Sequence, residues 1–206
     1  NLYDRLGARY TKALARSMAH TKQVKAASVL NNAFSSSFTG GDGVALVSDS
    51  HPLTGGGTFS NRPSTYTDLN ETSLEDALIS VSTFVDDRNM VIALQGTKLI
   101  VPPQLQFVVD RLLQTPGRVS TSDNDINAIR NMGMVPEGYS VNNFLTDTDA
   151  WFLLTDCPDG FKHFERSPLS TSMEGDFDTG NVRFKARERY SFGFSNPRAV
   201  FASQGA

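Results

Sequence analysis

The stretch from Asn181 to Ser195, NVRFKARERYSFGFS, alternates between apolar and polar residues almost without a break. Because successive side chains of a strand point to opposite faces, this alternation predicts a long, half-buried β-strand. The apolar face would carry Val182, Phe184, Ala186, Tyr190, Phe192 and Phe194. The other face would carry Arg183, Lys185, Arg187, Arg189 and Ser191. Glu188 is the one residue that interrupts the apolar face, so we expect one packed face and one face with four cations.

The first 25 residues carry a large basic excess. They contain six Lys or Arg residues and one acid, Asp4, and therefore carry +5, whereas the rest of the chain carries −8 to give the net charge of −3. Basic and acidic surfaces are thus segregated along the sequence. Residues 2–32 are also the best helix candidate, because they lack proline, contain one glycine and are rich in Ala, Leu, Lys and Arg.

Helical spacing divides this segment into two edges. The predicted packing edge consists of Leu6, Tyr10, Leu14, Ser17, Thr21, Val24 and Ser28. The predicted basic edge consists of Arg5, Arg9, Lys12, Arg16 and His20. A basic edge of this kind is typical of a solvated face or of salt bridges to neighbours, and contact with nucleic acid phosphate is the alternative.

The middle of the chain changes character twice. Residues 38–61 are rich in Ser, Thr and Gly, and predict a hairpin or extended loop on the surface. They lack the glycine spacing of a nucleotide site. From residue 67 the pattern predicts alternating helices and strands: helices through 74–81, 103–113 and 125–132, the first capped by Thr72 or Ser73, and strands at 98–101, 139–145 and 151–155. Residues 157–180 read as irregular.

The sequence offers no persuasive catalytic or metal-binding constellation. Cys157 is the single cysteine, and its neighbours Asp156 and Asp159 would disfavour the thiolate that a reaction with His163 as base requires. The three histidines lie in different segments. Asp123 and its neighbours imitate a calcium loop but lack its conserved glycine and final glutamate. We therefore expect no enzyme activity, no cofactor and no metal. We also see no signal peptide and no apolar run of ~20 residues, and expect no membrane partner.

Several segments, taken in order, resemble the major capsid proteins of tailed bacteriophages (Caudoviricetes). They are the long basic helix, the segments Asp42–Leu46 and Ser50–Leu53, the run Leu99–Leu105 that leads into Arg111–Leu113, and Arg187–Arg198. The resemblance covers nearly the whole chain. It implies an α+β chain with the Hong Kong 97-like capsid fold, in which a long spine helix and a sheet form a discontinuous peripheral domain around an inserted α/β axial domain. Residues 1–67 (spine helix 2–32, hairpin 38–61) and 157–206 would form the peripheral domain, and residues 68–156 the axial domain.

What the resemblance implies about function is assembly. The chain would be a structural subunit that forms pentamers and hexamers of an icosahedral capsid around phage DNA, in the virion and, during assembly, in the host cytoplasm. Partners would be copies of itself, decoration, portal and scaffold proteins, and double-stranded DNA through non-specific contacts. We expect the basic residues mainly at subunit interfaces and, as the alternative, facing DNA: Arg5, Arg9, Lys12, Arg16, Arg183, Lys185, Arg187 and Arg189.

One departure limits the transfer. Members of the family normally begin with an N-terminal arm and an extended loop, whereas the predicted helix here starts almost at residue 1, so no crosslinking chemistry is carried over. Two other functions stay open: an encapsulin-type protein nanocompartment, and a nucleic-acid-binding module that does not assemble.

Overall fold

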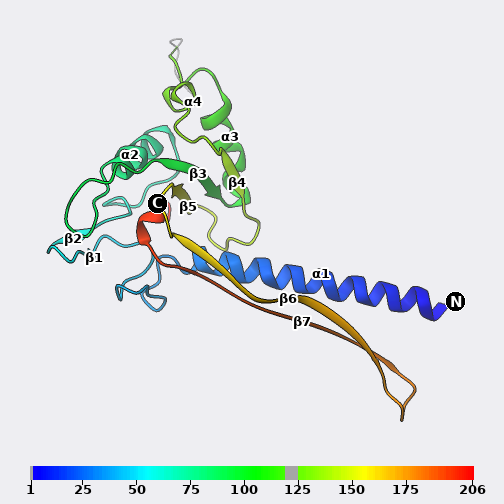
Figure 1. Cartoon of the computed structure of the whole chain (residues 1–206). Coiled ribbons are helices and arrows are strands. Elements are labelled where there is room, and N and C mark those ends of the chain that lie inside the picture. Colours follow the sequence, from blue (N-terminus) through cyan, green and yellow to red (C-terminus); the bar gives the residue numbers. More distant parts are fainter. Residues whose placement is uncertain (1, 119–124) are drawn as a thin grey trace.

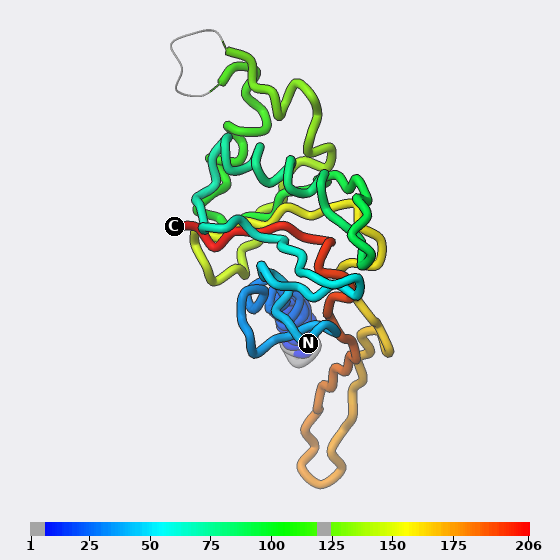
Figure 2. The backbone as a smooth tube through the Cα atoms, turned by 90° about the vertical axis from the view of Figure 1, so that its left-hand side faces the viewer, coloured from blue at the N-terminus to red at the C-terminus, as the bar shows by residue number. Residues whose placement is uncertain are grey.

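The computed structural model describes residues 2–118 and 125–206, with side chains from residue 7 onward. Two parts are visible in Figure 1: a body of short helices and strands, and an arm in which a long helix and a long β-hairpin run side by side away from that body. Figure 2, turned by 90°, shows the hairpin projecting below the body while the helix is seen end on. The two ends of the sequence supply the arm, and the middle supplies most of the body.

Helix α1, Leu2–Asn31, forms one element of the arm and confirms the predicted helix. Its 30 residues reach about 45 Å. The predicted packing edge is wrong for Tyr10 and Val24, which are 64% and 41% exposed, whereas Leu14 of that edge is half-buried. Between residues 7 and 25 the less exposed positions are Gly7, Thr11, Leu14, Ala15, Met18 and Lys22. A glycine, a threonine and a lysine are among them, so apolar identity alone did not locate the face that packs.

The hairpin consists of β6, Phe161–Gly175, and β7, Val182–Phe194. Strand β7 confirms the predicted strand, and its outward and inward residues alternate in exposure. The prediction that 157–180 is irregular is wrong, because β6 pairs antiparallel with β7 along its length. Its Ser- and Thr-rich sequence lacks an apolar period, and its register shifts between Glu165 and Ser170, around Pro168, which has no N–H for the ladder. The ladder with β7 therefore decides the conformation of β6.

A four-stranded sheet lies at the centre of the body, in the order β4-β3-β5-β8. Its strands are β3, Gly96–Val101, β4, Tyr139–Val141, β5, Trp151–Thr155, and β8, Val200–Ser203. The pair β3 and β4 is parallel, and the other two pairs are antiparallel. The strands that the sequence predicts at 98–101, 139–145 and 151–155 are present, although β4 ends at Val141. The C-terminal segment thus adds a strand to a sheet built mainly from the middle of the chain.

Short helices complete the body. Helix α2, Glu71–Ser82, begins earlier than predicted, because Asn70 is its N-cap and exchanges hydrogen bonds with Ser73 in a capping box. The 3₁₀ turn η1, Pro103–Leu105, leads into α3, Gln106–Gln114, and a second such turn, η2, Pro197–Ala199, precedes β8. Helix α4, Ala128–Met132, is capped by Asn127 and is shorter than predicted. For α2 and α4 the side-chain caps, and not the apolar periods, fix where the helix starts.

Two apolar clusters hold the molecule together. The larger one joins α2, α3 and the sheet, with Leu74, Val109, Leu99 and Trp151 almost fully buried. The smaller one joins the C-terminal end of α1 and the loop after it to the other face of β5 and β8, through Leu30, Leu46, Phe152 and Val200. Because β5 and β8 contribute to both clusters, the base of the arm packs on the sheet of the body.

The segment 38–61 forms only a small hairpin. Strands β1, His51–Pro52, and β2, Thr58–Phe59, pair antiparallel, and one isolated bridge joins Thr39 to Ala45. The expected surface position is wrong for its middle part, since Leu46 and Val47 are buried in the smaller cluster. The apolar run that contains Leu46 and Val47, inside a Gly-rich segment, could have indicated that this part is buried.

Candidate assembly surface

The contact between α1 and β7 positions the basic residues that the sequence singles out. Strand β7 turns its apolar face to the helix, and the Phe184 ring lies against Gly7, with its Cζ 3.4 Å from the place a Cβ would occupy. Farther along, the Lys22 ammonium lies 5.2 Å from the centre of the Tyr190 ring. The arm is therefore a two-layer structure with the helix on one side and the hairpin on the other (Figure 1).

An ion pair is built into this contact. Lys22 donates to Glu188 at 2.5 Å and to Glu165 at 3.4 Å, and the Glu188 side chain is 5% exposed. The hydrogen bond to Glu188 is the main cause that raises the pKa of Lys22 above its ordinary value. Glu188, the residue that interrupts the apolar face of β7 in the sequence, is thus the partner of a helix lysine. In the sequence, only one feature pointed to this pair: Glu188 is a single acid on an otherwise apolar strand face, which requires a cation when that face is buried.

Replacing Lys22 by methionine is expected to loosen the hairpin from α1. The change keeps the aliphatic stem but leaves the largely buried Glu188 carboxylate without its cation. Hydrogen exchange measured by mass spectrometry should become faster in β6 and β7 than in the parent. Lys25→Met is the control, because Lys25 is exposed and forms no ion pair with any described residue. Equal exchange in both variants would contradict a clamping role for Lys22.

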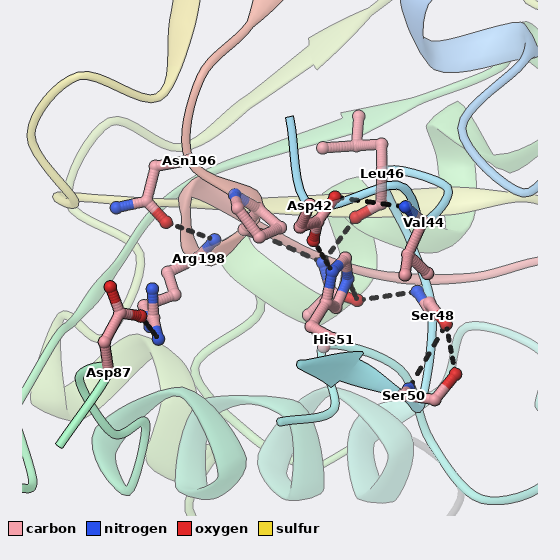
Figure 3. A network of polar contacts seen from close by, with 11 residues as sticks. Asp42, Val44, Leu46, Ser48, Ser50, His51, Asp87, Asn196 and Arg198 are labelled. Atoms are coloured by element: carbon pink, nitrogen blue, oxygen red, sulfur yellow. Dashed lines mark hydrogen bonds and ion pairs between the residues drawn. The ribbon is translucent and has the colours of Figure 1, made fainter. Parts of the chain in front are cut away.

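A buried polar network fixes the base of the arm (Figure 3). The Asn61 side chain is fully buried; its amide donates to the carbonyls of Leu46 at 2.7 Å and Pro197 at 2.9 Å, and its oxygen accepts from the Ser48 N–H at 2.9 Å. His51 Nδ1 lies 2.6 Å from Asp42 Oδ2. The network ties the loop after α1 to the segment that follows β7.

Arg198 extends this junction into the body. Its Nε donates to the Val85 carbonyl at 2.6 Å, and its Nη2 donates to Asp87 at 2.8 Å, as Figure 3 shows for the ion pair with Asp87. At the end of α1, Asn31 donates to the Phe144 carbonyl at 3.0 Å and accepts from the Thr146 N–H at 3.0 Å. These contacts fix the direction in which helix and hairpin leave the body.

The predicted basic residues lie on two opposite outer faces of the arm. Arg9, Lys12 and Arg16 are exposed and lie on α1 opposite the positions that face the hairpin, and none forms an ion pair with a described residue. Arg5 lies in α1, and its side chain is outside the described set. We call Arg5, Arg9, Lys12 and Arg16 the helix set, and Arg183, Lys185, Arg187 and Arg189 the strand set. The structure keeps the two sets apart, and their described side chains point outward.

The strand set forms a polar face on the hairpin. Lys185, Arg187 and Arg189 are exposed, and the register places each opposite a serine of β6: Ser172, Ser170 and Ser167. These three cations form no ion pair with a described residue, whereas Arg183 donates to Asp176 at 2.8 Å. An outward row of unpaired cations beside hydroxyl groups suits an anionic partner, either protein carboxylates or phosphates.

The other candidate groups do not assemble into a reactive site. Burial is the main cause that raises the pKa of the Cys157 thiol, which disfavours the thiolate. His163 stacks on Phe192 with ring centres 4.7 Å apart. The residues that the structure describes contain no group of three or more metal-ligating side chains, and Asp123 lies outside them. No described helix is long and apolar enough to cross a membrane.

Comparison with known proteins identifies the chain. Residues 3–203 match the family described as phage capsid protein. The chain belongs to the phage capsid protein family. The resemblance that the sequence motifs indicated is thereby confirmed.

Solved structures show what fold the capsid protein shares. A structure of Mycobacterium phage Che8 has a TM-score of 0.51 at 14% identity, and the match covers 96% of this chain and 63% of that one. A virus-like particle from Pyrococcus furiosus has a TM-score of 0.43 at 13% identity, with 69% and 55% covered. The capsid protein chain thus spans between 55% and 63% of the length of these two chains. No curated protein sequence matches.

Proposed function

We propose that the capsid protein is the major structural subunit of an icosahedral phage capsid and that it assembles with copies of itself around double-stranded DNA. The observation that carries this proposal is the family match over residues 3–203. A structural role suits the chemistry of the described residues, whose buried acid, histidine and arginine are engaged in ion pairs and hydrogen bonds that hold the fold.

The fold we propose in detail is the Hong Kong 97-like fold. Helix α1 would be the spine helix. Residues 1–67 and 157–206 would form the peripheral domain, and residues 68–156 the axial domain. The packing of α1 against β7, from opposite ends of the chain, supports a discontinuous peripheral part. In this division β8 belongs by sequence to the peripheral part and by pairing to the axial sheet, so the two domains share one sheet.

The exposed cations would serve the shell. We propose that the helix set, including Arg5, and the strand set contact mainly acidic surface of adjacent subunits, since complementary charge sets orientation and register between repeated copies. Packaged DNA would meet whatever part of these sets faces the interior, through non-specific phosphate contacts. The subunits would form pentamers and hexamers, and would work with portal, scaffold and decoration proteins. Assembly would take place in the host cytoplasm, and the finished protein would be part of the virion.

Sedimentation of the purified full-length protein tests this function. We expect uniform particles far heavier than a monomer, and nucleic acid in particles isolated from phage-producing cells. A shell that holds protein cargo in place of DNA would support a nanocompartment instead. A monomer that binds DNA in a salt-dependent manner without assembling would contradict the capsid function.

A further inference from the structure

The turn that joins β6 to β7 is ordered by its own contacts. We call residues 174–180 the hairpin tip. The Asp176 N–H donates to the Asn181 carbonyl at 2.8 Å, and the Asp176 carboxylate accepts from the Asp178 N–H at 3.2 Å and from Arg183 at 2.8 Å. Gly180, with φ of +67°, donates to the Asp176 carbonyl at 2.9 Å. The turn is therefore held by hydrogen bonds within the end of the hairpin, between residues 176 and 183.

Phe177 sits in the middle of this ordered turn with its side chain fully exposed to solvent. Nearby on the hairpin, Met173 is 69% exposed and Val182 is 54% exposed. An aromatic side chain has only two side-chain torsions to fix when it is buried in an interface, and such residues are common binding hot spots. The end of the hairpin therefore presents an apolar anchor that nothing in the described chain covers.

Charge indicates which surface this anchor meets. The hairpin tip contains Glu174, Asp176 and Asp178 and no cation, and because Arg183 pairs with Asp176, a local charge of −2 is left for a partner. Residues 7–20 of α1 contain Arg9, Lys12 and Arg16 and no acid, so this stretch carries +3. The two surfaces are complementary in charge, and the aliphatic stems of these cations offer apolar contact to an aromatic ring.

The tip and the basic edge of one subunit point away from each other. The basic edge lies on the side of α1 opposite the positions that face the hairpin. Figures 1 and 2 both show the end of the hairpin curving away from α1. The partner of the tip must therefore come from a second molecule, and in a shell the available second molecule is another copy of this chain.

We propose that the hairpin tip of one subunit docks on the basic edge of α1 of a neighbouring copy, with Phe177 on the aliphatic stems of that edge and the tip carboxylates near Arg9, Lys12 and Arg16. The proposal rests on the proposed shell function and names one of its interfaces. Because each arm gives one tip and receives another, the contact is head-to-tail and closes into a ring when the copies are related by rotation.

Charge exchange tests the docking without disturbing the turn, provided that Asp176 is left intact. Phe177→Ser, Asp178→Lys and Lys12→Glu, each alone, should lower the yield of sedimenting particles about tenfold or more. Asp178→Lys combined with Lys12→Glu should recover most of that yield. Phe107→Ser is the matched control and should assemble like the parent, because Phe107 is 69% exposed on α3 and lies outside both surfaces. All these side chains are exposed, so the melting temperature of the unassembled subunit should not change.

A second measurement uses parental particles only. A carbodiimide joins a carboxylate to the Lys12 amine as an amide, and the water lost in the condensation converts the reagent to its urea. Mass spectrometry should then find Lys12 joined to Glu174 or Asp178. The docking would be overturned if Lys12 were joined only to other carboxylates. It would also be overturned if the single variants assembled like the parent, or if the combined variant assembled no better than the single ones. A parent that forms no particles at all would overturn the shell function as well.

Discussion

A variant that reverses the three unpaired cations of β7, Lys185→Glu, Arg187→Glu and Arg189→Glu together, is expected to assemble poorly. These side chains are exposed and have no anionic partner among the described residues, so the isolated subunit does not depend on them. If they meet acidic surface of a neighbour, reversal creates like-charge contacts that cost several kcal/mol, and particle yield should fall about tenfold or more. Sedimentation of the assembly reaction measures this yield.

The same variant separates the two partners that an outward cationic face can have. Loss of shells with an unchanged subunit melting temperature supports intersubunit contact. Normal shells that retain less DNA, or retain it with a weaker dependence on salt, would show that the strand set faces phosphate. Arg88→Glu is a control for a charge reversal outside the arm, because Arg88 is exposed on the loop after α2.

Replacing Asn61 by leucine is expected to be among the most destabilising single changes in the chain. Leucine fits the volume but leaves two carbonyls and one N–H without partners in a buried site. Each orphaned group costs about 1–3 kcal/mol, so unfolding free energy should fall by roughly 3 kcal/mol or more. The loss acts at the base of the arm, where Asn61 ties the loop after α1 to Pro197.

Urea unfolding followed by circular dichroism checks this value. Asn143→Leu is the matched control, because Asn143 is exposed and its side chain makes no hydrogen bond with a described residue. The control should change stability by less than about 0.5 kcal/mol. If Asn61→Leu falls within about 1 kcal/mol of the parent, the junction in Figure 3 does not hold the arm as described.

Elements with a strong local period could be predicted from the sequence. The alternation in 181–195 gave β7 within a residue at each end, and the proline-free basic stretch gave α1. The outward direction of the β7 cations followed from the same two-residue period. Such patterns can be read from the sequence because the geometry of a single strand or helix decides which side each residue faces.

Features that depend on distant residues could not be predicted. Strand β6 forms only because β7 lies beside it, and its Ser- and Thr-rich sequence carries no period of its own. The side of α1 that packs was misjudged because Tyr10 is apolar enough to suggest burial, whereas Lys22 packs through a pair with Glu188, 166 residues away. Phe177 was overlooked because an aromatic residue in an irregular segment signals nothing until its exposure is known.

Electron cryo-microscopy of the purified full-length protein would show the shell and its subunit contacts. We expect icosahedral shells in which α1 and the β6–β7 hairpin lie at subunit boundaries and Arg183, Lys185 and Arg187 contact protein neighbours. A field of monomers, or a shell in which these three side chains have no protein neighbour, would contradict this expectation.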